Sequence, residues 1–260
     1  MKTIAVIFGG RSAEHDVSIV TAIASIIKPL ELSKKYRVEA VYIAKNGAWF
    51  WSDKLKDIKL FSSGKIDKYM EHAQPASVQF DGGMVLSRLG RIGRSRHRKI
   101  DIVFPSTHGT FGEDGSLMGL LDMANVPYVG CGLEASALAM NKVIGKQIAS
   151  AAGIPVTKFL HFTNKQLEHD QTAAVKQITR ELKYPLFIKP AHLGSSIGIS
   201  RAKDDTELRN GLEVAAHYDD LILVEEAVQN LIEVTLPVMG NHDLTPAYLE
   251  QPLLEAEDFF

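Results

Sequence analysis

The chain has 260 residues, of which 45% are hydrophobic and 23% charged, proportions typical of a folded globular protein and not of a disordered one. Its 29 basic and 31 acidic residues give a formal net charge of -2, so no global positive field is available to hold nucleic acid or an anionic membrane. The single cysteine, Cys131, excludes an internal disulfide, and the sequence shows neither a signal-peptide core nor a membrane-length apolar run. We therefore expect a cytoplasmic protein with no membrane or nucleic-acid partner.

The first half of the sequence alternates short apolar runs with helical segments. Strands are predicted at residues 4–8, 36–44 and 100–104, and helices at 17–30, ending near Pro29, and at 116–125. Asn46-Gly47 is typical of a hairpin, with Trp49, Phe50 and Trp51 as packing residues behind it. The alternation favours a parallel sheet with helices on its faces, and ligands bind at the carboxyl ends of such strands. Residues 53–95 carry no clear pattern.

The second half follows a domain boundary near residue 130. One long helix is predicted over 133–152, closed by Gly153 and Pro155. Beyond it we expect strands at 156–161, 186–189 and 221–225, and helices at 172–182 and 204–217.

The turn Gly194-Ser195-Ser196-Ile197-Gly198 follows an apolar strand that delivers Lys189 to its end. Glycines let the backbone approach an anion, while successive N–H groups and the two serine hydroxyls supply donors to phosphate oxygens. A nucleotide-phosphate site beside Lys189 is the functional interpretation. On composition alone, an ordinary hairpin with solvated serines explains the turn equally well.

Other phosphate, metal and nucleic-acid motifs fit less well. Gly9-Gly10-Arg11-Ser12 lacks the three-glycine dinucleotide fingerprint, and no P-loop sequence occurs, which disfavours a dehydrogenase or a P-loop enzyme. His108, Glu113 and Asp114 do not match the standard zinc spacings. A basic run precedes residue 100, but no aromatic residue interleaves it, so a solvated hairpin is favoured over a nucleic-acid site. The run comprises Arg91, Arg94, Arg96, Arg98 and Lys99.

Five sequence blocks occur in the order seen in D-alanine:D-alanine ligases, and the chain resembles that family over nearly its whole length. The blocks are Phe8 to Ser18, His108 to Gly115, Pro127 to Gly130, Met140 to Lys142, and Lys189 to Gly198. The resemblance implies an α/β chain in which an N-terminal parallel-sheet domain, residues 1–130, precedes an ATP-grasp fold. It implies a central ATP-grasp domain over 131–222 and the start of an incomplete C-terminal domain over 223–260.

The resemblance also implies roles for individual residues at the nucleotide site. Lys142 and Lys189 resemble the two lysines that contact ATP phosphates, which fits a compact cation near shifting charge. A solvated helix residue is the alternative for Lys142. The phosphate-covering loop is matched by Ser195, Ser196 and Gly198.

The segment that begins at Glu225 resembles the edge that reads adenine, with Val228 in it. Glu233 resembles the carboxylate that binds the ribose hydroxyls, although its spacing from Glu225 is one residue longer than the family form. Both glutamates would also fit an exposed strand edge.

Glu14 resembles the carboxylate that holds the ammonium group of the first D-amino acid, and Ser195 is implied to share its hydrogen-bonded cluster. These two are the catalytic candidates. His108 and Glu113 match the loop that faces the substrates. The alternative for Glu14 is a first-turn helix residue stabilised by the helix dipole.

The family reaction implies ATP-dependent joining of two D-alanines through an acyl phosphate, with Mg²⁺ bridging phosphates. The resemblance places the family's metal ligands beyond Phe260, and Asn141 and Met118 stand where aspartate and glutamine are usual. D-serine or D-lactate as the second substrate, and a non-catalytic nucleotide-binding remnant, stay open. A homodimer is the assembly that is common in the family.

Overall fold

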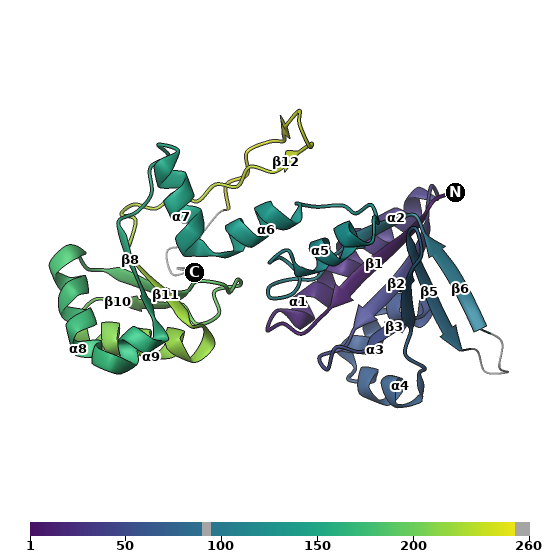
Figure 1. Cartoon of the computed structure of the whole chain (residues 1–260), viewed down its shortest axis with the longest axis horizontal. Helices are drawn as coiled ribbons and strands as arrows, with labels where there is room; N and C mark the ends of the chain where they lie inside the picture. Colours follow the sequence, from purple (N-terminus) through teal and green to yellow (C-terminus); the bar gives the residue numbers. More distant parts are fainter. Residues whose placement is uncertain (90–94, 253–260) are drawn as a thin grey trace. The chain divides into compact units, whose positions relative to one another are not determined.

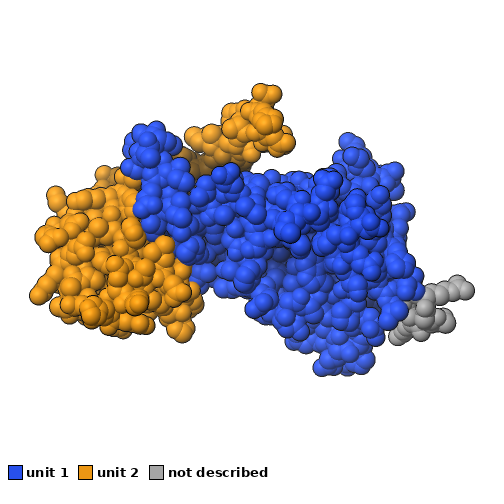
Figure 2. All heavy atoms as spheres, viewed as in Figure 1, with its two compact units in different colours: residues 1–155, 190–197 blue, residues 156–189, 198–260 orange. Residues whose placement is uncertain are grey.

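The computed structural model describes residues 1–89 and 95–252. They pack as two compact units, coloured separately in Figure 2. Unit 1 comprises residues 1–155 and 190–197, and unit 2 comprises residues 156–189 and 198–260. Among the described helices, none has both the length and the apolar character needed to cross a membrane. Each unit has its own hydrophobic core.

Unit 1 is built on a four-stranded sheet of order β3-β2-β1-β7 (Figure 1). β1 (Thr3–Gly9) pairs in parallel with β2 (Arg37–Ile43) and with β7 (Ile102–Pro105), and β3 (Trp49–Trp51) is antiparallel to β2. All seven residues of β1 are buried because it is an interior strand with both faces covered. The predicted parallel sheet and the hairpin at Asn46-Gly47 are confirmed.

Side chains of β1 alternate between two cores, as the pleat of a strand requires. Val6 and Phe8 pack with Ile23 and Ile27 of the helical segment that follows β1. Ile7 packs on the opposite face, with residues of α5 (Ser116–Met123) and with Met84 and Leu86. The helical segment consists of α1 (His15–Val20), the π-helix η1 (Thr21–Ile27) and α2 (Lys28–Ser33).

The region between β3 and β7 contains most of the elements that the sequence left unassigned. These are η2 (Asp53–Lys56), α3 (Ile58–Ser62), α4 (Ile66–His72), β4 (Ser77–Phe80), β5 (Met84–Leu89) and β6 (Ser95–Ile100). β4, β5 and β6 form an antiparallel sheet. It confirms a hairpin at the basic run, of which Arg96, Arg98 and Lys99 lie in β6, whereas Arg91 and Arg94 lie outside the described residues.

The predicted strand at 100–104 is wrong as a single element. Ile100 ends β6, whereas β7 begins at Ile102 in the other sheet. Asp101 lies between them, and its backbone N–H donates to Thr3 O (3.0 Å) while its carboxylate accepts from Thr3 N (2.7 Å). This pair of bonds to the start of β1 marks where the chain leaves one sheet and enters the other.

Two predicted helix boundaries are also wrong. The first helix continues past Pro29 to Ser33, because the wider π-helical turns that precede Pro29 accommodate a residue without an N–H donor. The helix predicted at 133–152 is two helices, α6 (Leu133–Met140) and α7 (Lys142–Ala151). Asn141 separates them, since its extended backbone stops α6 and its side chain accepts from the N–H groups of Val143 and Ile144.

Unit 2 has a sheet of order β10-β9-β11-β8 with helices α8 and α9 packed against it (Figure 1). The elements are β8 (Phe159–Thr163), α8 (Asn164–Glu181), β9 (Leu186–Pro190), β10 (Ser200–Ala202), α9 (Asp205–Tyr218) and β11 (Leu221–Glu226), followed by a short exposed pair, β12 (Val238–Met239) and β13 (Thr245–Pro246). β8 begins later than predicted, and α8 begins earlier, because Thr163 and Gln166 form a capping box at its start.

Asn141→Ala should destabilise the protein by about 1 kcal/mol, since it removes the side-chain acceptor at the start of α7. Asn141→Asp is the matched control, because a carboxylate keeps the acceptor and interacts favourably with a helix N-terminus. Urea unfolding followed by circular dichroism measures both. Equal loss of stability in the two variants would show that the cap is not what Asn141 contributes.

Candidate functional site

The carboxyl ends of β1 and β7 are joined by one buried hydroxyl. Ser18 Oγ accepts from Gly9 N (2.7 Å) and donates to the carbonyl of Ser106 (2.6 Å). Gly9 has φ of 84°, and a Cβ there would lie 2.3 Å from Ile43 O, so only glycine fits this turn. The turn that leads to Glu14 is thereby fixed at the end of the sheet where ligands bind in α/β folds.

His15 is buried under the same turn and bonds through both ring nitrogens. Nδ1 lies 2.6 Å from Gly10 O, and Nε2 lies 3.0 Å from the hydroxyl of Tyr42. Because a carbonyl only accepts, Nδ1 carries the proton, and a neutral ring then accepts from Tyr42 at Nε2. Burial, followed by the charges of Asp67 and Asp16, raises the pKa of Tyr42 to about 12, which keeps the hydroxyl protonated as this bond requires.

Glu14 is 5% exposed, and its carboxylate is only partly satisfied. Oε1 accepts a short hydrogen bond from Ser195 Oγ, whereas Oε2 is buried with no hydrogen-bond partner among the described residues. Gly109 and Gly194 let the backbone come close: a Cβ at Gly109 would lie 2.4 Å from Oε2, and one at Gly194 would lie 3.0 Å from either oxygen. The structure therefore brings together the two residues predicted to be catalytic.

His108 and Glu113 lie beside this carboxylate. One potential ligand atom from each, and one from Glu14, lie within 4.8 Å of one another, close enough for the three to share a cation. Glu113 Oε2 also accepts from Gly109 N (2.8 Å), which closes the loop upon itself. Asp114 accepts from the N–H groups of Phe111 (2.8 Å) and Ser116 (2.9 Å), so it shapes the loop and the start of α5.

The serine turn has a backbone suited to anions. Ser195 and Ser196 have φ of 48° and 56°, and the N–H of Ile197 bonds to Gly194 O (3.1 Å). The N–H groups of Ser195 and Ser196 have no acceptor among the described residues, and consecutive N–H groups of this kind form concave anion sites. The left-handed backbone at two serines, where glycine is usual, is strained and typical of functional turns.

The start of α7 holds the segment that leads into this turn. Lys142 Nζ donates to the carbonyl of Leu193, and the backbone N–H of Lys142 donates to Ala191 O (3.0 Å). Asn141 Nδ2 lies 3.0 Å from Nε2 of His192, a histidine for which the sequence indicated no role. Lys142 is therefore not a solvated helix residue.

The remaining predicted residues lie in unit 2. Lys189 Nζ is 2.6 Å from Glu225 Oε1, and Thr157 Oγ1 donates to Glu225 Oε2 (2.6 Å), so Glu225 is buried and not on an exposed edge. Val228 is exposed, and Glu233 lies in an exposed stretch with no described contact to Glu225. Gly198 also belongs to unit 2 and has φ of 73°.

Sequence reasoning missed Ser18, His15 and Tyr42, which position the site. It also missed Thr157, which donates to the same carboxylate, Glu225, that pairs with Lys189. Only a weak signal existed: Ser18 and His15 lie in the block that follows β1, at positions where an apolar helix face would be expected. Their partners Ser106, Tyr42 and Gly10 come from three different segments, which no local pattern indicates.

Two family descriptions match this sequence: "D-ala D-ala ligase N-terminus" over residues 3–131 and "D-ala D-ala ligase C-terminus" over residues 148–260. The chain belongs to the D-alanine–D-alanine ligase family. Its curated relatives include the D-alanine–D-alanine ligases of Acetivibrio thermocellus, 39% identical, and of Chloroherpeton thalassium, 35% identical. Each alignment covers 93% of this chain, but the chain spans only 66% and 65% of the length of these relatives.

Solved structures of the family confirm the fold class. The D-alanine–D-alanine ligase from Coxiella burnetii matches with a TM-score of 0.81 and 30% identity, covering 97% of this chain and 71% of that one. The VanG D-Ala:D-Ser ligase from Enterococcus faecalis matches with a TM-score of 0.77 and 33% identity, covering 96% and 69%. The predicted parallel-sheet domain followed by an ATP-grasp fold is thus confirmed.

The Tyr42→Phe variant should lose less folding stability than the wild type as the pH rises from 10 to 12. In the wild type, the pKa of Tyr42 is about 12 in the folded state, against an ordinary value of 10.0. The contribution of the protonated hydroxyl to folding stability is therefore complete below pH 10 and is lost as the pH rises toward 12. Urea unfolding from pH 9 to 12 measures the decline. Tyr248→Phe, at a side chain that is 92% exposed, should keep the wild-type decline; identical curves for both variants would contradict the assignment.

Proposed function

We propose that this chain carries the nucleotide site and the first amino-acid site of an ATP-dependent ligase that joins two D-alanines for peptidoglycan precursor synthesis. The observation that supports the proposal best is the buried Glu14 carboxylate bonded to Ser195 of the serine turn. This hydrogen bond joins Glu14, the residue predicted to hold the first amino acid, to the predicted phosphate loop within unit 1.

Glu14 orients the ammonium group of the first D-alanine in this proposal. A buried carboxylate oxygen without a partner is costly, and a cation that donates hydrogen bonds to it removes that cost. His108 and Glu113 flank the same place, where they would fix the position of the amino acid relative to the turn. Ser195 would then align the turn with the bound amino acid.

The phosphates of ATP bind at the serine turn in this proposal, where the N–H groups of Ser195 and Ser196 have no acceptor among the described residues. Lys142, Lys189 and Gly198 are also assigned to phosphate binding in this proposal, and Lys142 fixes the backbone that leads into the turn. Lys189 is paired with Glu225, so its ammonium group is held in place without ligand. Because the carboxylate of Glu225 is already bonded to Lys189 and Thr157, backbone groups from Glu225 to Val228 would recognise the adenine. Glu233 would bind the ribose hydroxyls.

The proposed reaction has two displacements. A carboxylate oxygen of the first D-alanine attacks the γ-phosphorus of ATP, which forms an acyl phosphate and releases ADP. The amine of the second D-alanine attacks the acyl carbon, loses a proton, and expels inorganic phosphate. Positioning and charge neutralisation by the residues named above carry most of such chemistry.

Mg²⁺ is proposed as a requirement of this reaction, because it neutralises phosphate charge when bound. The one cluster of acidic and histidine side chains found among the described residues is Glu14, His108 and Glu113. Its histidine and its bond to Ser195 do not suit an ion that prefers oxygen ligands and water. No step is therefore assigned to Mg²⁺ here.

The domain limits at residues 130 and 222 and a homodimeric assembly are part of the proposal. A D-Ala:D-Ser ligase is the second candidate, since the VanG enzyme is among the similar structures at 33% identity. A chain that binds ATP without turnover is the third.

Lys189→Ala should weaken ATP binding by roughly tenfold or more, since it removes a charge-assisted contact to phosphate. Ser200→Ala, on the neighbouring strand β10, is the control and should change the affinity by less than about twofold. Calorimetric titration measures both, with thermal melts to confirm folding. Equal ATP affinities in the two variants would remove Lys189 from the site.

Glu14→Gln tests the amino-acid site through phosphate release in the presence of ATP, Mg²⁺ and D-alanine. The variant should raise the KM for D-alanine at least about tenfold while ATP affinity stays unchanged, because only the ammonium contact loses its charge. Replacing the second D-alanine by D-serine separates the two ligase candidates. ATP binding without phosphate release by the wild type would support the non-catalytic candidate instead.

A further inference from the structure

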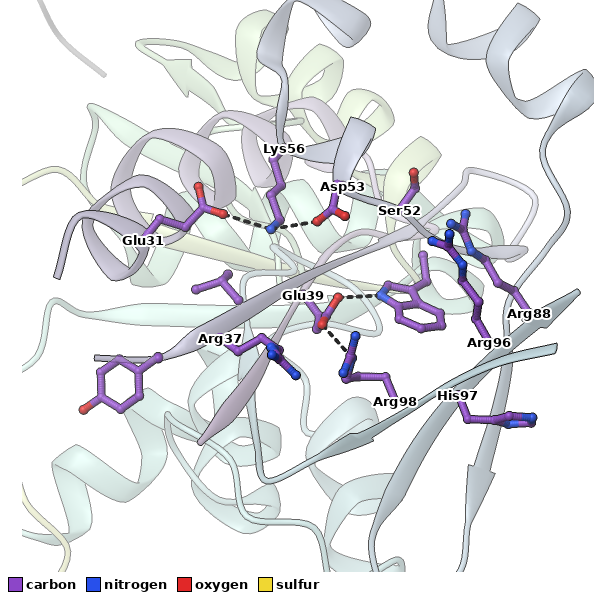
Figure 3. Close-up of a pocket in the computed structure, with 13 residues that line it drawn as sticks. Glu31, Arg37, Glu39, Ser52, Asp53, Lys56, Arg88, Arg96, His97 and Arg98 are labelled. Carbon is purple, nitrogen blue, oxygen red and sulfur yellow. Dashed lines mark hydrogen bonds and ion pairs between the residues drawn. The ribbon is translucent and has the colours of Figure 1, made fainter. Parts of the chain in front are cut away.

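A pocket of about 680 Å³ lies in unit 1 (Figure 3). It is at the start of β2, whereas Glu14 follows the carboxyl end of the parallel strand β1. Arg37 and Val38, at the start of β2, line it, together with Trp51 of β3, the segment that follows β3, and residues of the β5–β6 hairpin. Its size is that of small-molecule sites, about 300–1,000 Å³. It is separate from Glu14 and from the serine turn bonded to it, because Glu14 follows the carboxyl end of β1.

The lining of this pocket is rich in charge. Five permanent cations and three carboxylates face it, an excess of two positive charges in a chain of net charge -2. The cations are Arg37, Lys56, Arg88, Arg96 and Arg98, and the carboxylates are Glu31, Glu39 and Asp53.

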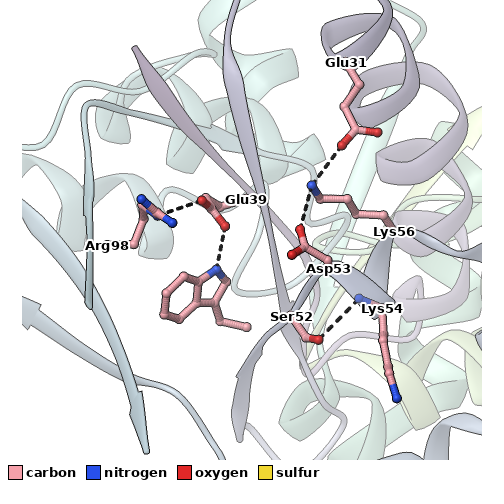
Figure 4. Close-up of polar contacts among 8 residues, drawn as sticks. Glu31, Glu39, Ser52, Asp53, Lys54, Lys56 and Arg98 are labelled. Carbon is pink, nitrogen blue, oxygen red and sulfur yellow. Dashed lines mark hydrogen bonds and ion pairs between the residues drawn. The ribbon is translucent and has the colours of Figure 1, made fainter. Parts of the chain in front are cut away.

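All three carboxylates are paired with two cations of the same lining, Lys56 and Arg98 (Figure 4). Lys56 Nζ lies 2.9 Å from Glu31 and 3.0 Å from Asp53. Glu39 lies 2.8 Å from Arg98 Nε and also accepts from the indole N–H of Trp51 (2.8 Å). Two of the five cations are thus neutralised within the wall of the pocket.

The other three cations have no carboxylate partner among the described residues: Arg37, Arg88 and Arg96. Arg88 and Arg96 are directly opposite each other in the β5–β6 register, so their side chains share one face of the hairpin. Figure 3 shows their guanidinium groups side by side. Like charges in this position are destabilising, and a bridging anion would offset their repulsion.

Trp51 fixes the position of one member of this pair. The guanidinium carbon of Arg88 lies 5.6 Å from the centroid of the indole ring, and the indole N–H is held by Glu39. This arrangement restricts Arg88 before any ligand binds, which lowers the entropy cost of binding.

We propose that this pocket binds a small ligand through a multiply charged oxyanion group of the phosphate or diphosphate class, held by Arg88 and Arg96 with Arg37. Guanidinium groups match phosphate oxygens by paired hydrogen bonds, and a doubly negative group equals the charge excess of the pocket. The inference does not depend on the ligase reaction.

Inorganic pyrophosphate is the probe, titrated at constant ionic strength maintained with sodium chloride. Both tryptophans of the chain, Trp49 and Trp51, lie in β3, so intrinsic fluorescence reports on this pocket. The wild type should give a saturable change. The combined variant Arg88→Gln and Arg96→Gln should weaken binding at least about tenfold.

Lys99→Gln is the matched control, since Lys99 carries the same charge on the same strand but does not line the pocket. It should leave the affinity within about twofold of the wild type. Lys189→Ala should also keep the fluorescence change, which separates this pocket from the proposed nucleotide site. Melting temperatures supply a second measurement: pyrophosphate should raise that of the wild type and not that of the double variant.

Three results would overturn the proposal. One is the absence of a saturable change in the wild type. Another is an equal loss in Lys99→Gln, which would indicate a general basic surface such as one for nucleic acid. The third is a signal that survives in the double variant but disappears in Lys189→Ala.

Discussion

A single buried carboxylate, that of Glu14, connects turns that are 181 positions apart in the chain, since its Oε1 accepts from Ser195. Burying a carboxylate is costly, so the surrounding chain must supply donors and stay close to it. Glycine at 109 and 194 permits that approach, because a Cβ at either position would meet the carboxylate oxygens. Lys142 holds the segment before Ser195, and the serine turn therefore packs with unit 1.

Around this carboxylate, buried polar groups are satisfied by partners from several strands. Ser18 joins the ends of β1 and β7, and His15 joins the glycine turn to Tyr42 of β2. These bonds fix the backbone on which Glu14 is placed before any ligand arrives, which is how a rigid scaffold positions a site. The start of β2 in the same sheet carries the arginine pocket, where charge is left in excess instead of being satisfied.

Much of the fold was predictable because its elements follow simple periodicities. β1, β2, β9 and β11 are short apolar runs, and α9 has the apolar spacing of a helix face. The failures have local causes that depend on context. In the sequence, Asn141 looks like an ordinary helix residue, but in the structure its side chain caps α7. Pro29 indicates a helix end, but the π-helical turns before it accommodate the proline. In the three-stranded sheet of β4, β5 and β6, only a hairpin at the basic run was predicted, because the outer face of its strands is polar and shows no apolar alternation.

The sequence by itself determined the order of the elements and the family's motif blocks, because short-range pattern and motif spacing are properties of the chain. It pointed to Glu14, Ser195 and Lys189 as residues of chemical interest. Tertiary structure decided their partners: Ser195 bonds to Glu14, Lys189 pairs with Glu225, and Arg88 opposes Arg96. Such contacts join segments that are distant in sequence, and their energies depend on burial and strand register, which only the folded chain sets.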